Sequence, residues 1–576
     1  MCGIIGYIGE REANDILING LQQLEYRGYD SAGIAIINNQ NITIHKVEGR
    51  VNKLRIGKLE GTLGIGHTRW ATHGKPEDRN AHPFSDEEHN FVIVHNGIIE
   101  NYLELKAGLQ EAGVKFTSDT DSEVIVHLIA KAYQGNLKDA VLKVVPKLQG
   151  SFALCVIHHD SEEIVAARNG SPLLIGIGKN EKFLASDASA IIEHTKEVVY
   201  INDFEIVQLK KDSLDIYTFE GEKKDYQVKE LNWDLEQAQK SGYKHFMLKE
   251  IYEQPKVIEE SLKVSFDINK DFDKIILIAC GTASYAGLVG KYVIEKVARI
   301  PVINEIASEF RYKNPIISDK DLVIAISQSG ETADTLAAIR LAKQKGAKTL
   351  GIINVVDSTI AREVDSVVYT RAGPEIGVAS TKAFTSQLVT LYQLAFHLAN
   401  EEHDFNSIKE KVEQTLTLNK QIKEIAKKYY KYSNFLYIGR NLNFPLALEG
   451  ALKLKEISYI HAEAYPAGEL KHGPIALVSE DMPTLAICPK DSVYEKTLSN
   501  IEEIKARSGR IIAIATEEDE KIKSVSEDII YVPQVEEFLY PLITVIPLQL
   551  FAYHIADLRE CDIDKPRNLA KSVTVE

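Results

Sequence analysis

A cysteine at position 2 is the first residue of this sequence that is suited to covalent chemistry. If Met1 is removed, Cys2 becomes the N-terminus and carries both a thiol and a free α-amine. An α-amine titrates at about 7.7–8.0 and a thiol at about 8.5, so the amine can serve as the general base for its own thiol. The apolar run 4–8 after Gly3 predicts a buried strand that would hold this nucleophile. The alternative is a small hydrophobic residue behind a retained Met1.

A glycine-bracketed polar loop is the next candidate for chemistry. Residues 66–74 read GHTRWATHG, which is too polar and irregular for a core element. Loops that carry Arg, Trp and His together often bind ligands, although a solvated turn is an equally good interpretation.

Two polar positions farther along also have competing interpretations. Asn96-Gly97 follows a predicted strand, and this dipeptide is the strongest short signal for a hairpin turn. The Asn96 side chain and the Gly97 N–H could instead face an oxyanion. Asp121 lies in a capping-box pattern at 120–123, before a helix predicted over 124–132. It would either complement the helix dipole or hold a ligand ammonium.

Five segments in this order, MCGIIGYIG, YRGYDSAG, GHTRWATHG, VHNGIIEN and TDSE, resemble the glutaminase domain of N-terminal-nucleophile glutamine amidotransferases. The resemblance implies that Cys2 attacks the side-chain amide of glutamine and that Asn96 with Gly97 forms the oxyanion hole. It assigns Arg69 to the substrate carboxylate and Asp121 to the substrate amine. The remaining pocket residues that it implies are Trp70, Thr72 and His73.

A hydroxyl-rich loop carries the clearest chemistry of the second half. Residues 327–332 read SQSGET, between a strand predicted at 322–326 and a helix that begins near Thr332. Ligands of open α/β sheets lie at the carboxyl ends of strands. Helix N–H groups with three hydroxyls make an anion site without added positive charge, which suits a chain of net charge −16. An ordinary serine-rich helix cap is the alternative.

Three titratable residues follow in the second half. Lys453 and Glu456 share a face of a helix predicted over 446–457, which favours a surface ion pair. Glu456 could instead be the general base that moves a proton between C1 and C2 of a ketose. His472 lies in the loop 468–474, where a histidine is ordinarily solvated.

SQSGET resembles the phosphate loop of sugar isomerase (SIS) domains, and two such domains behind a glutaminase resemble the glutamine–fructose-6-phosphate aminotransferase family. The resemblance implies glutamine and fructose 6-phosphate as substrates, with no cofactor and no metal. Glu456 would be the proton-transfer base, and His472 would open the sugar ring from the neighbouring subunit of a homodimer. Lys571, in the closing PRNLAKSVTVE, would form a Schiff base. The implied sugar-phosphate contacts are Thr282, Ser284, Ser327, Gln328, Ser329, Thr332, Val378, Ser380, Lys453 and Ala570.

One departure from that family concerns the loop after residue 279. Many members read Cys-Gly-Thr-Ser, whereas Ala283 follows Thr282 in this chain and the serine comes one residue later, as Ser284. Thr282 is therefore the safer sugar contact.

The elements that must position these residues form a repeated pattern. Strands alternate with helices twice after a charged, Gln-rich linker, which predicts two doubly wound α/β domains with parallel sheets. Together with this pattern, the two resemblances imply a fold class of an α+β N-terminal-nucleophile (αββα) domain followed by two SIS domains. The predicted ranges are 1–219 for the glutaminase, 220–244 for the linker, 245–410 and 411–556 for the SIS domains, and 557–576 for the active-site tail.

Composition excludes several classes of protein. The net charge of −16 argues against nucleic acid binding, which depends on neutralising phosphates. The five scattered cysteines contain no CxxC pair, which fits a reducing cytosol. No apolar run is expected to approach the ~20 residues of a membrane span, and no signal peptide is indicated. We therefore expect a cytoplasmic enzyme without a membrane or nucleic acid partner. The alternatives are an amidotransferase for another keto-sugar phosphate and a sugar-phosphate-sensing regulator.

Overall fold

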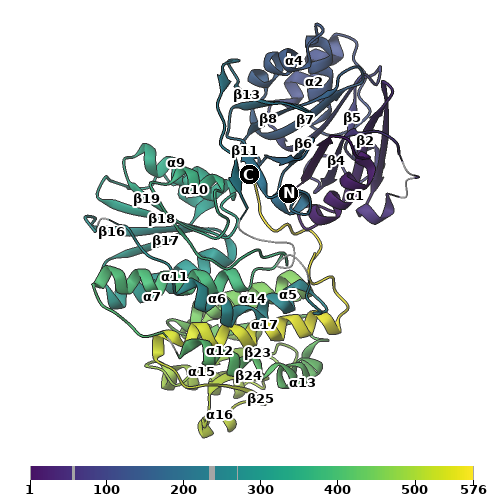
Figure 1. Ribbon diagram of the computed structural model, residues 1–576. Helices are drawn as coiled ribbons and strands as arrows, with labels where there is room; N and C mark the ends of the chain where they lie inside the picture. Colours follow the sequence, from purple (N-terminus) through teal and green to yellow (C-terminus); the bar gives the residue numbers. More distant parts are fainter. Residues whose placement is uncertain are drawn as a thin grey trace. The chain divides into compact units, whose positions relative to one another are not determined.

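The computed structural model describes residues 2–54, 57, 59–231, 240–268, 270–405 and 407–574 (Figure 1). The chain divides into two compact units, one of Met1–Ala238 with Ala570–Glu576 and one of Gln239–Leu569.

Two antiparallel sheets form the first unit. The first sheet runs in the order β15-β11-β9-β10-β1-β4-β2-β3, with bounds β1 Gly3–Ile8, β2 Ser31–Asn38, β3 Asn41–Glu48, β4 Leu63–Arg69, β9 Leu174–Gly178, β10 Glu181–Ala185, β11 Glu197–Tyr200 and β15 Lys229–Glu230. The second runs β14-β13-β12-β8-β7-β6-β5, with β5 Phe84–Ser85, β6 Phe91–Ile99, β7 Gly150–His158, β8 Glu163–Asn169, β12 Glu205–Lys210, β13 Leu214–Thr218 and β14 Lys223–Lys224. The helices are α1 Ala13–Leu24, α2 Tyr102–Glu111, α3 Glu123–Ala132 and α4 Leu137–Val144.

The strand that follows Cys2 shows how these layers stack. Side chains of a strand alternate between its two faces. Ile4 and Ile8 join the core between the two sheets, while Ile5 and Tyr7 pack with the buried residues of α1. Both faces of β1 are therefore buried, as the continuous apolar run predicts. Because α3 and α4 pack with residues of the second sheet, the unit has the predicted αββα stacking.

Two parallel sheets with surrounding helices form the second unit. Their strands are β16 Lys274–Ala279, β17 Val302–Ile306, β18 Asp321–Ser327, β19 Lys348–Ile353 and β20 Ser366–Tyr369, then β21 Asn434–Gly439, β22 His461–Pro466, β23 Thr484–Cys488, β24 Ile511–Thr516 and β25 Asp528–Val532. The helices are α5 Phe246–Tyr252, α6 Gln254–Ser261, α7 Gly281–Val297, α8 Ala307–Phe310, α9 Ala333–Gln344, α10 Thr359–Glu363, α11 Lys382–Ala399, α12 Ile408–Leu416, α13 Asn419–Tyr429, α14 Asn443–Ser458, α15 Tyr494–Lys505, α16 Glu520–Lys523 and α17 Tyr540–Leu558.

The two parallel sheets repeat one topology, which confirms the predicted pair of doubly wound domains. Their orders are β17-β16-β18-β19-β20 and β22-β21-β23-β24-β25. In each sheet the first strand in the chain lies between the second and the third, so the strand order reverses beside it. Ligands of doubly wound folds bind at such a point, outside the carboxyl ends of the strands. The loops after β16 and β18, and after β21 and β23, are therefore the places to look for a site.

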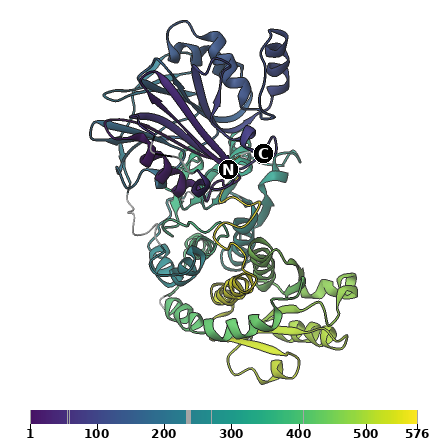
Figure 2. The ribbon, with the colours of Figure 1, turned by 90° about the vertical axis from the view of Figure 1, so that its right-hand side faces the viewer.

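Helix α17 corrects the expectation about apolar runs. The segment Glu537–Leu558 is long and apolar enough to cross a membrane, although 94% of its most apolar window is buried inside the structure. It packs against α13 and α14, and Figure 2 shows it nearly end-on among the helices of its unit. A helix that is apolar all round is expected where neighbours cover every face, and α17 has that place in the core of the second unit.

The first part of the predicted linker differs from the expectation. Strands β14 and β15 lie inside 220–244 and pair with β13 and β11, so these residues extend the sheets of the first unit. Residues 232–239 of that linker lie outside the described residues.

Candidate active site

The sulfur of Cys2 lies directly against the loop that begins at Trp70. The Trp70 backbone N–H donates to Cys2 Sγ at 3.3 Å. Burial raises the pKa of the Cys2 thiol, and the Trp70 hydrogen bond and the Arg69 charge act in the opposite direction. A buried thiol needs a nearby base to become the attacking thiolate.

Asn96 and Gly97 lie inside strand β6, so the hairpin interpretation of this dipeptide is wrong. They pair with Ala153 and Phe152 of β7 in an unbroken antiparallel ladder. The Asn96 Nδ2 donates to the Cys2 carbonyl oxygen at 3.2 Å, which places the amide beside the nucleophile. Gly97 has φ +125°, and a Cβ there would lie 1.9 Å from the Ser151 carbonyl oxygen, so glycine is required.

Arg69 organises the loop that follows it. It is buried at the end of β4, and its guanidinium donates to the backbone carbonyls of His73, Gly74 at 3.0 Å and Lys75 at 3.3 Å. Three loop carbonyls on one cation fix the loop between Trp70 and Lys75.

The other predicted glutamine contacts gather around that loop. Asp121 is buried, and its Oδ1 lies 4.0 Å from His73 Nδ1. Its Oδ2 accepts the Ile99 N–H at 2.8 Å. Asp121 therefore bonds to strand β6 and faces His73. Thr72 is exposed, with Oγ1 3.4 Å from His73 Nδ1.

The capping-box prediction at 120–123 is wrong. Ser122 precedes α3 without a side-chain cap, and the Glu123 carboxylate turns back to earlier residues. It accepts the N–H and O–H groups of Thr117 and Ser118, at 2.7–2.8 Å. Burial alone would raise the pKa of Glu123, but His127 and these donors lower it to about 2. Glu123 thus shapes the loop that carries Asp121.

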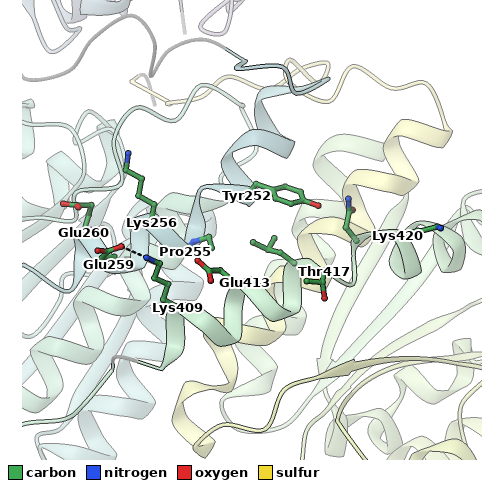
Figure 3. Close-up of a pocket in the computed structure, with 11 residues that line it drawn as sticks. Tyr252, Pro255, Lys256, Glu259, Glu260, Lys409, Glu413, Thr417 and Lys420 are labelled. Carbon is green, nitrogen blue, oxygen red and sulfur yellow. Dashed lines mark hydrogen bonds and ion pairs between the residues drawn. The ribbon is translucent and has the colours of Figure 1, made fainter.

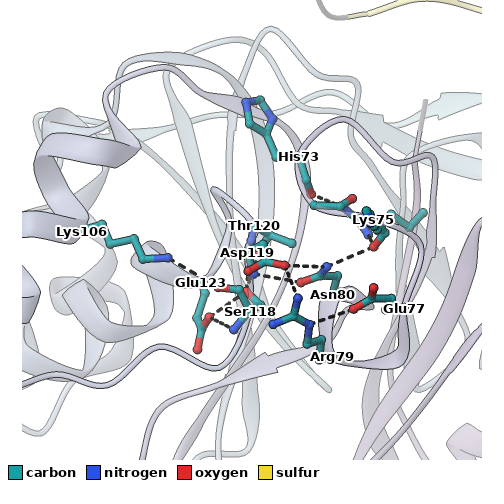
Figure 4. Close-up of polar contacts among 12 residues, drawn as sticks. His73, Lys75, Glu77, Arg79, Asn80, Lys106, Ser118, Asp119, Thr120 and Glu123 are labelled. Atoms are coloured by element: carbon teal, nitrogen blue, oxygen red, sulfur yellow. Dashed lines mark hydrogen bonds and ion pairs between the residues drawn. The ribbon is translucent and has the colours of Figure 1, made fainter.

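A second polar network ties this loop to the one after Arg69 (Figure 4). The fully buried Asn80 donates to the Lys75 carbonyl at 3.1 Å and accepts the Asp119 N–H at 2.9 Å. Arg79 pairs with Asp119 at 2.6 Å. The two loops that carry the predicted glutamine contacts are therefore linked to each other.

Sequence reasoning missed two residues that position Cys2 and its loop. Arg27 donates from Nε to the Cys2 carbonyl at 3.3 Å, and Asp30 accepts the Ala71 N–H at 2.8 Å. Both belong to the segment YRGYDSAG, so the motif was found while its residues received no role.

In the second unit, the loop Ser327–Thr332 has the shape of an anion site at the end of β18. Ser327 Oγ accepts the Gly330 N–H at 3.0 Å and lies 3.4 Å from Thr332 Oγ1. Ser329 Oγ accepts the Glu331 N–H at 3.1 Å, and Gln328 is half-buried beside it. Gly330 has φ +64°, where a Cβ would meet Ser358 Oγ at 1.9 Å. Thr332 precedes α9, so the hydroxyls surround the N-terminus of that helix.

Lys453 and Glu456 are not a surface ion pair. Lys453 is fully buried, and its Nζ lies 2.7 Å from Glu456 Oε2, 3.4 Å from Glu449 Oε1 and 3.0 Å from Thr282 Oγ1. Burial alone would lower the pKa of Lys453, yet the carboxylates of Glu449 and Glu456 raise it overall. Burial raises the pKa of Glu449 to about 7. This cluster joins α14 of the second domain to Thr282 in the first turn of α7.

Glu449 is a residue that sequence reasoning missed. It precedes Lys453 by one helical turn on α14, so the spacing that drew attention to Lys453 and Glu456 also contained it. Nothing in the sequence shows that this face of the helix is buried.

The remaining predicted sugar contacts of the first domain lie in two places, helix α7 and the loop before α11. Ser284 is buried within α7, whereas Thr282 faces Lys453. Ser380 Oγ donates to Glu375 at 3.0 Å, and the Val378 N–H donates to the Asp564 carbonyl at 3.1 Å. The loop before α11 is thus fixed at both residues.

The last three predicted residues are His472, Ala570 and Lys571. His472 is exposed at the end of a short 3-10 helix, Ala467–His472. Ala570 and Lys571 belong to the C-terminal segment that groups with the first unit.

A groove on the second unit contains none of the predicted residues (Figure 3). It has a volume of about 900 Å³ between α6 and α12, and Lys409 pairs with Glu259 within it at 2.7 Å. With charges of both signs facing each other, it does not have the character of a phosphate site.

Comparisons with known proteins match both parts of the chain. The model described as "Glutamine amidotransferase domain" matches residues 67–193, and "SIS domain" matches residues 270–397 and 428–558. A protein of Aquifex aeolicus named glutamine–fructose-6-phosphate aminotransferase [isomerizing] is 54% identical over all of both chains. Its namesakes from Chlorobaculum tepidum and Thermus thermophilus are 51% and 49% identical, again over all of each chain. The chain belongs to this family.

Solved structures related to this aminotransferase family match the second unit's fold. The C-terminal domain of glucosamine-fructose-6-phosphate aminotransferase from Francisella tularensis is 42% identical, with a TM-score of 0.54 over 57% of this chain and 100% of its own. A glucosamine-6-phosphate deaminase from Thermotoga maritima is 25% identical, with a TM-score of 0.50 over the same shares. These matches confirm the predicted family and the fold class of an amidotransferase followed by two SIS domains.

Proposed function

We propose that this enzyme converts glutamine and fructose 6-phosphate to glutamate and glucosamine 6-phosphate, the first step of amino-sugar synthesis. The observation that carries the proposal is the presence of two different candidate sites in one chain. Cys2 lies beside the Asn96 amide in one unit, and Lys453 joins Glu456 to Thr282 in the other. Its full-length relatives bear the name of this reaction.

Glutamine hydrolysis uses the first unit. After removal of Met1, the Cys2 amine takes the thiol proton, and the sulfur attacks the side-chain amide of glutamine. The Asn96 amide and the Gly97 N–H stabilise the oxyanion that forms. Arg69 and Asp121 bind the substrate carboxylate and amine, with Trp70, Thr72 and His73 lining the pocket. Trp70 gates the internal transfer of ammonia to the sugar site.

Sugar conversion uses the second unit together with the C-terminal tail. The hydroxyls of Ser327–Thr332 and the N-terminus of α9 hold the phosphate. The remaining predicted contacts hold the sugar, and His472 of the neighbouring subunit helps to open its ring. Lys571 forms a Schiff base with the open-chain ketose, and Glu456 moves a proton between C1 and C2. The scheme uses no metal and no cofactor.

The setting that we propose is a homodimer in the cytoplasm. The dimer follows from the role given to His472, which is exposed in the chain. The reducing compartment follows from the cysteines, all five of which are unpaired in the structure.

The experiment that tests the function follows glutamate and amino sugar in one reaction. Wild-type protein with glutamine and fructose 6-phosphate should form both products in equal amounts. Cys2→Ala should abolish glutamine hydrolysis, and Lys571→Arg should abolish sugar turnover while glutamine hydrolysis persists. Binding of both substrates without turnover would favour a sugar-sensing regulator instead. Faster reaction with another ketose phosphate would change the substrate.

The roles of Met1 and of internal transfer have their own readouts. Intact mass should show active protein without Met1, because a peptide bond would remove the amine that acts as base. With saturating fructose 6-phosphate, ammonia should not escape at the rate of glutamine hydrolysis, and escape at that rate would contradict internal transfer.

A further inference from the structure

The side-chain amide of Asn96 is held at both ends by buried groups. Its Nδ2 lies 3.2 Å from the Cys2 carbonyl oxygen, and its Oδ1 lies 3.1 Å from Nε2 of His67. The same His67 nitrogen lies 2.9 Å from the His95 carbonyl oxygen. His67 comes from β4 and Asn96 from β6, so the contact joins the two sheets of the first unit.

The carbonyl partner fixes the proton on His67. A carbonyl oxygen only accepts hydrogen bonds, so Nε2 must carry hydrogen and donate to His95 O. His67 is fully buried, and this burial lowers its pKa to about 3, so the imidazole is neutral. A neutral ring with hydrogen on Nε2 has none on Nδ1. Among the described residues, Nδ1 has no hydrogen-bond partner that would favour the other tautomer.

That tautomer fixes the orientation of the Asn96 amide. An N–H donor at His67 requires an acceptor opposite it, which must be Oδ1 of Asn96. The Nδ2 group must then face Cys2, and it does so as a donor to a carbonyl oxygen. A flipped amide would set two donors against each other at His67 and two acceptors at Cys2.

We propose that His67 is a positioning residue for glutamine hydrolysis, which selects the Asn96 orientation that presents N–H to the oxyanion. The inference rests on the proposed function of Cys2. His67 has no exposed surface, so it acts through Asn96 and not by touching glutamine.

The first test replaces His67 by Phe, which keeps a ring and removes the donor. An oxyanion donor contributes about 10²–10³-fold to kcat, so a donor that is present but misoriented should cost about 10–100-fold. The KM for glutamine should change less than about threefold, because the contacts of the substrate carboxylate and amine remain. His67→Gln, which keeps an N–H, should recover part of the loss. His82→Phe is the matched control, since the His82 ring lies against His67 with ring centroids 4.0 Å apart and has no hydrogen bond to Asn96.

A double-mutant cycle separates positioning from general support of the fold. In an Asn96→Ala background, His67→Phe should cost less than about threefold in kcat, because the group that it orients is gone. Equal losses in both backgrounds, or a change confined to KM, would overturn the proposal. Alkylation of Cys2 by iodoacetamide forms no oxyanion, so its rate should be unchanged in folded His67→Phe. If that variant does not fold, the cycle is run with His67→Gln against Asn96→Ala.

The histidine tautomer can also be read in the unmutated protein. Nitrogen-15 spectra of histidine-labelled protein should show His67 neutral, with hydrogen on Nε2, from pH 6 to 8. A proton on Nδ1, or titration within that range, would refute the inference even if glutaminase activity is present. Absence of glutamine hydrolysis by the wild type would instead refute the function of Cys2, and the spectra would still decide the tautomer.

Discussion

The two SIS domains have the same strand order but opposite chemistry at equivalent loops. After β18, the first domain places the hydroxyls of Ser327, Ser329 and Thr332 around the N-terminus of α9. After β23, the second domain places Asp491 before α15. The Asp491 carboxylate accepts the Val493 N–H at 2.9 Å and the Asn443 side chain at 2.7 Å.

The second domain therefore supplies its own anion where the first leaves hydroxyls for a ligand. Its contribution to the candidate sugar site comes from another element, α14, whose Lys453 reaches Thr282 of the first domain. In the proposed function, one domain holds the phosphate and the other holds the acid–base residues. The two domains share a strand order, so the difference between their proposed roles lies in side chains, at the loop after β18 in one domain and on α14 in the other.

The largest effect is expected at Glu456 on helix α14. Glu456→Gln removes the proposed base, so sugar turnover should fall about 10²–10⁴-fold, while glutamine hydrolysis stays within about threefold. Amino-sugar and glutamate assays on one preparation measure both. Lys455→Gln, at an exposed neighbour on α14, is the control. Retention of more than half of the sugar turnover by Glu456→Gln would remove the acid–base role from the second domain.

The phosphate loop should respond through binding. Ser329→Ala removes a hydroxyl that would donate to a charged phosphate, a bond of about 1.5–3 kcal/mol, so KM for fructose 6-phosphate should rise about 10–150-fold. Ser492→Ala alters the exposed hydroxyl of the equivalent loop in the second domain and should leave KM unchanged. Initial rates over a range of sugar concentrations measure this difference. Equal effects from both variants would contradict the assignment of phosphate to the first domain.

The sequence predicted most elements because their local patterns agree with the fold. The buried strand after Cys2, the repeat of strands and helices, and the hydroxyl loop before α9 all follow from short-range periodicity and composition. The pair of parallel α/β domains was therefore accessible from the pattern, whereas the αββα class of the first unit came from the resemblance of its motifs to a known family.

The errors came from tertiary partners. Asn96-Gly97 has the local preference of a turn, yet pairing with β7 along the whole of β6 keeps it extended. The spacing of Lys453 and Glu456 was correct, but only the packing of α14 against α7 and α17 makes that face buried. The long apolar run of α17 was overlooked, and its neighbours determine that it is a core helix.

The buried carboxylate on α14 should give the second domain a pH-dependent stability. Glu449 has a pKa of about 7 in the folded chain against an ordinary 4.5, so the native state holds a proton that the unfolded state releases between these values. The contribution of protonated Glu449 to the free energy of unfolding is complete below pH 4.5. It is lost as pH rises to 7, and the loss amounts to at most about 3 kcal/mol. Glu449→Gln should therefore gain stability relative to wild type as pH rises from 5 to 7.5, measured by urea unfolding. A constant difference between the two proteins would contradict this, and Glu502→Gln, at an exposed site, is the control.

The smallest effect is expected at the internal anion of the second domain. Asp491→Ala removes the acceptor for Val493 and Asn443, so stability should fall by about 1 kcal/mol, as for a lost helix cap. The KM for fructose 6-phosphate should not change, because the proposed phosphate site is in the other domain. If Asp491 takes the place of a bound anion, inorganic phosphate at tens of millimolar should restore part of the lost thermal stability of Asp491→Ala while leaving wild type unaffected. A raised KM for the sugar would show instead that this loop serves the substrate, and the division of roles between the two domains would then be wrong.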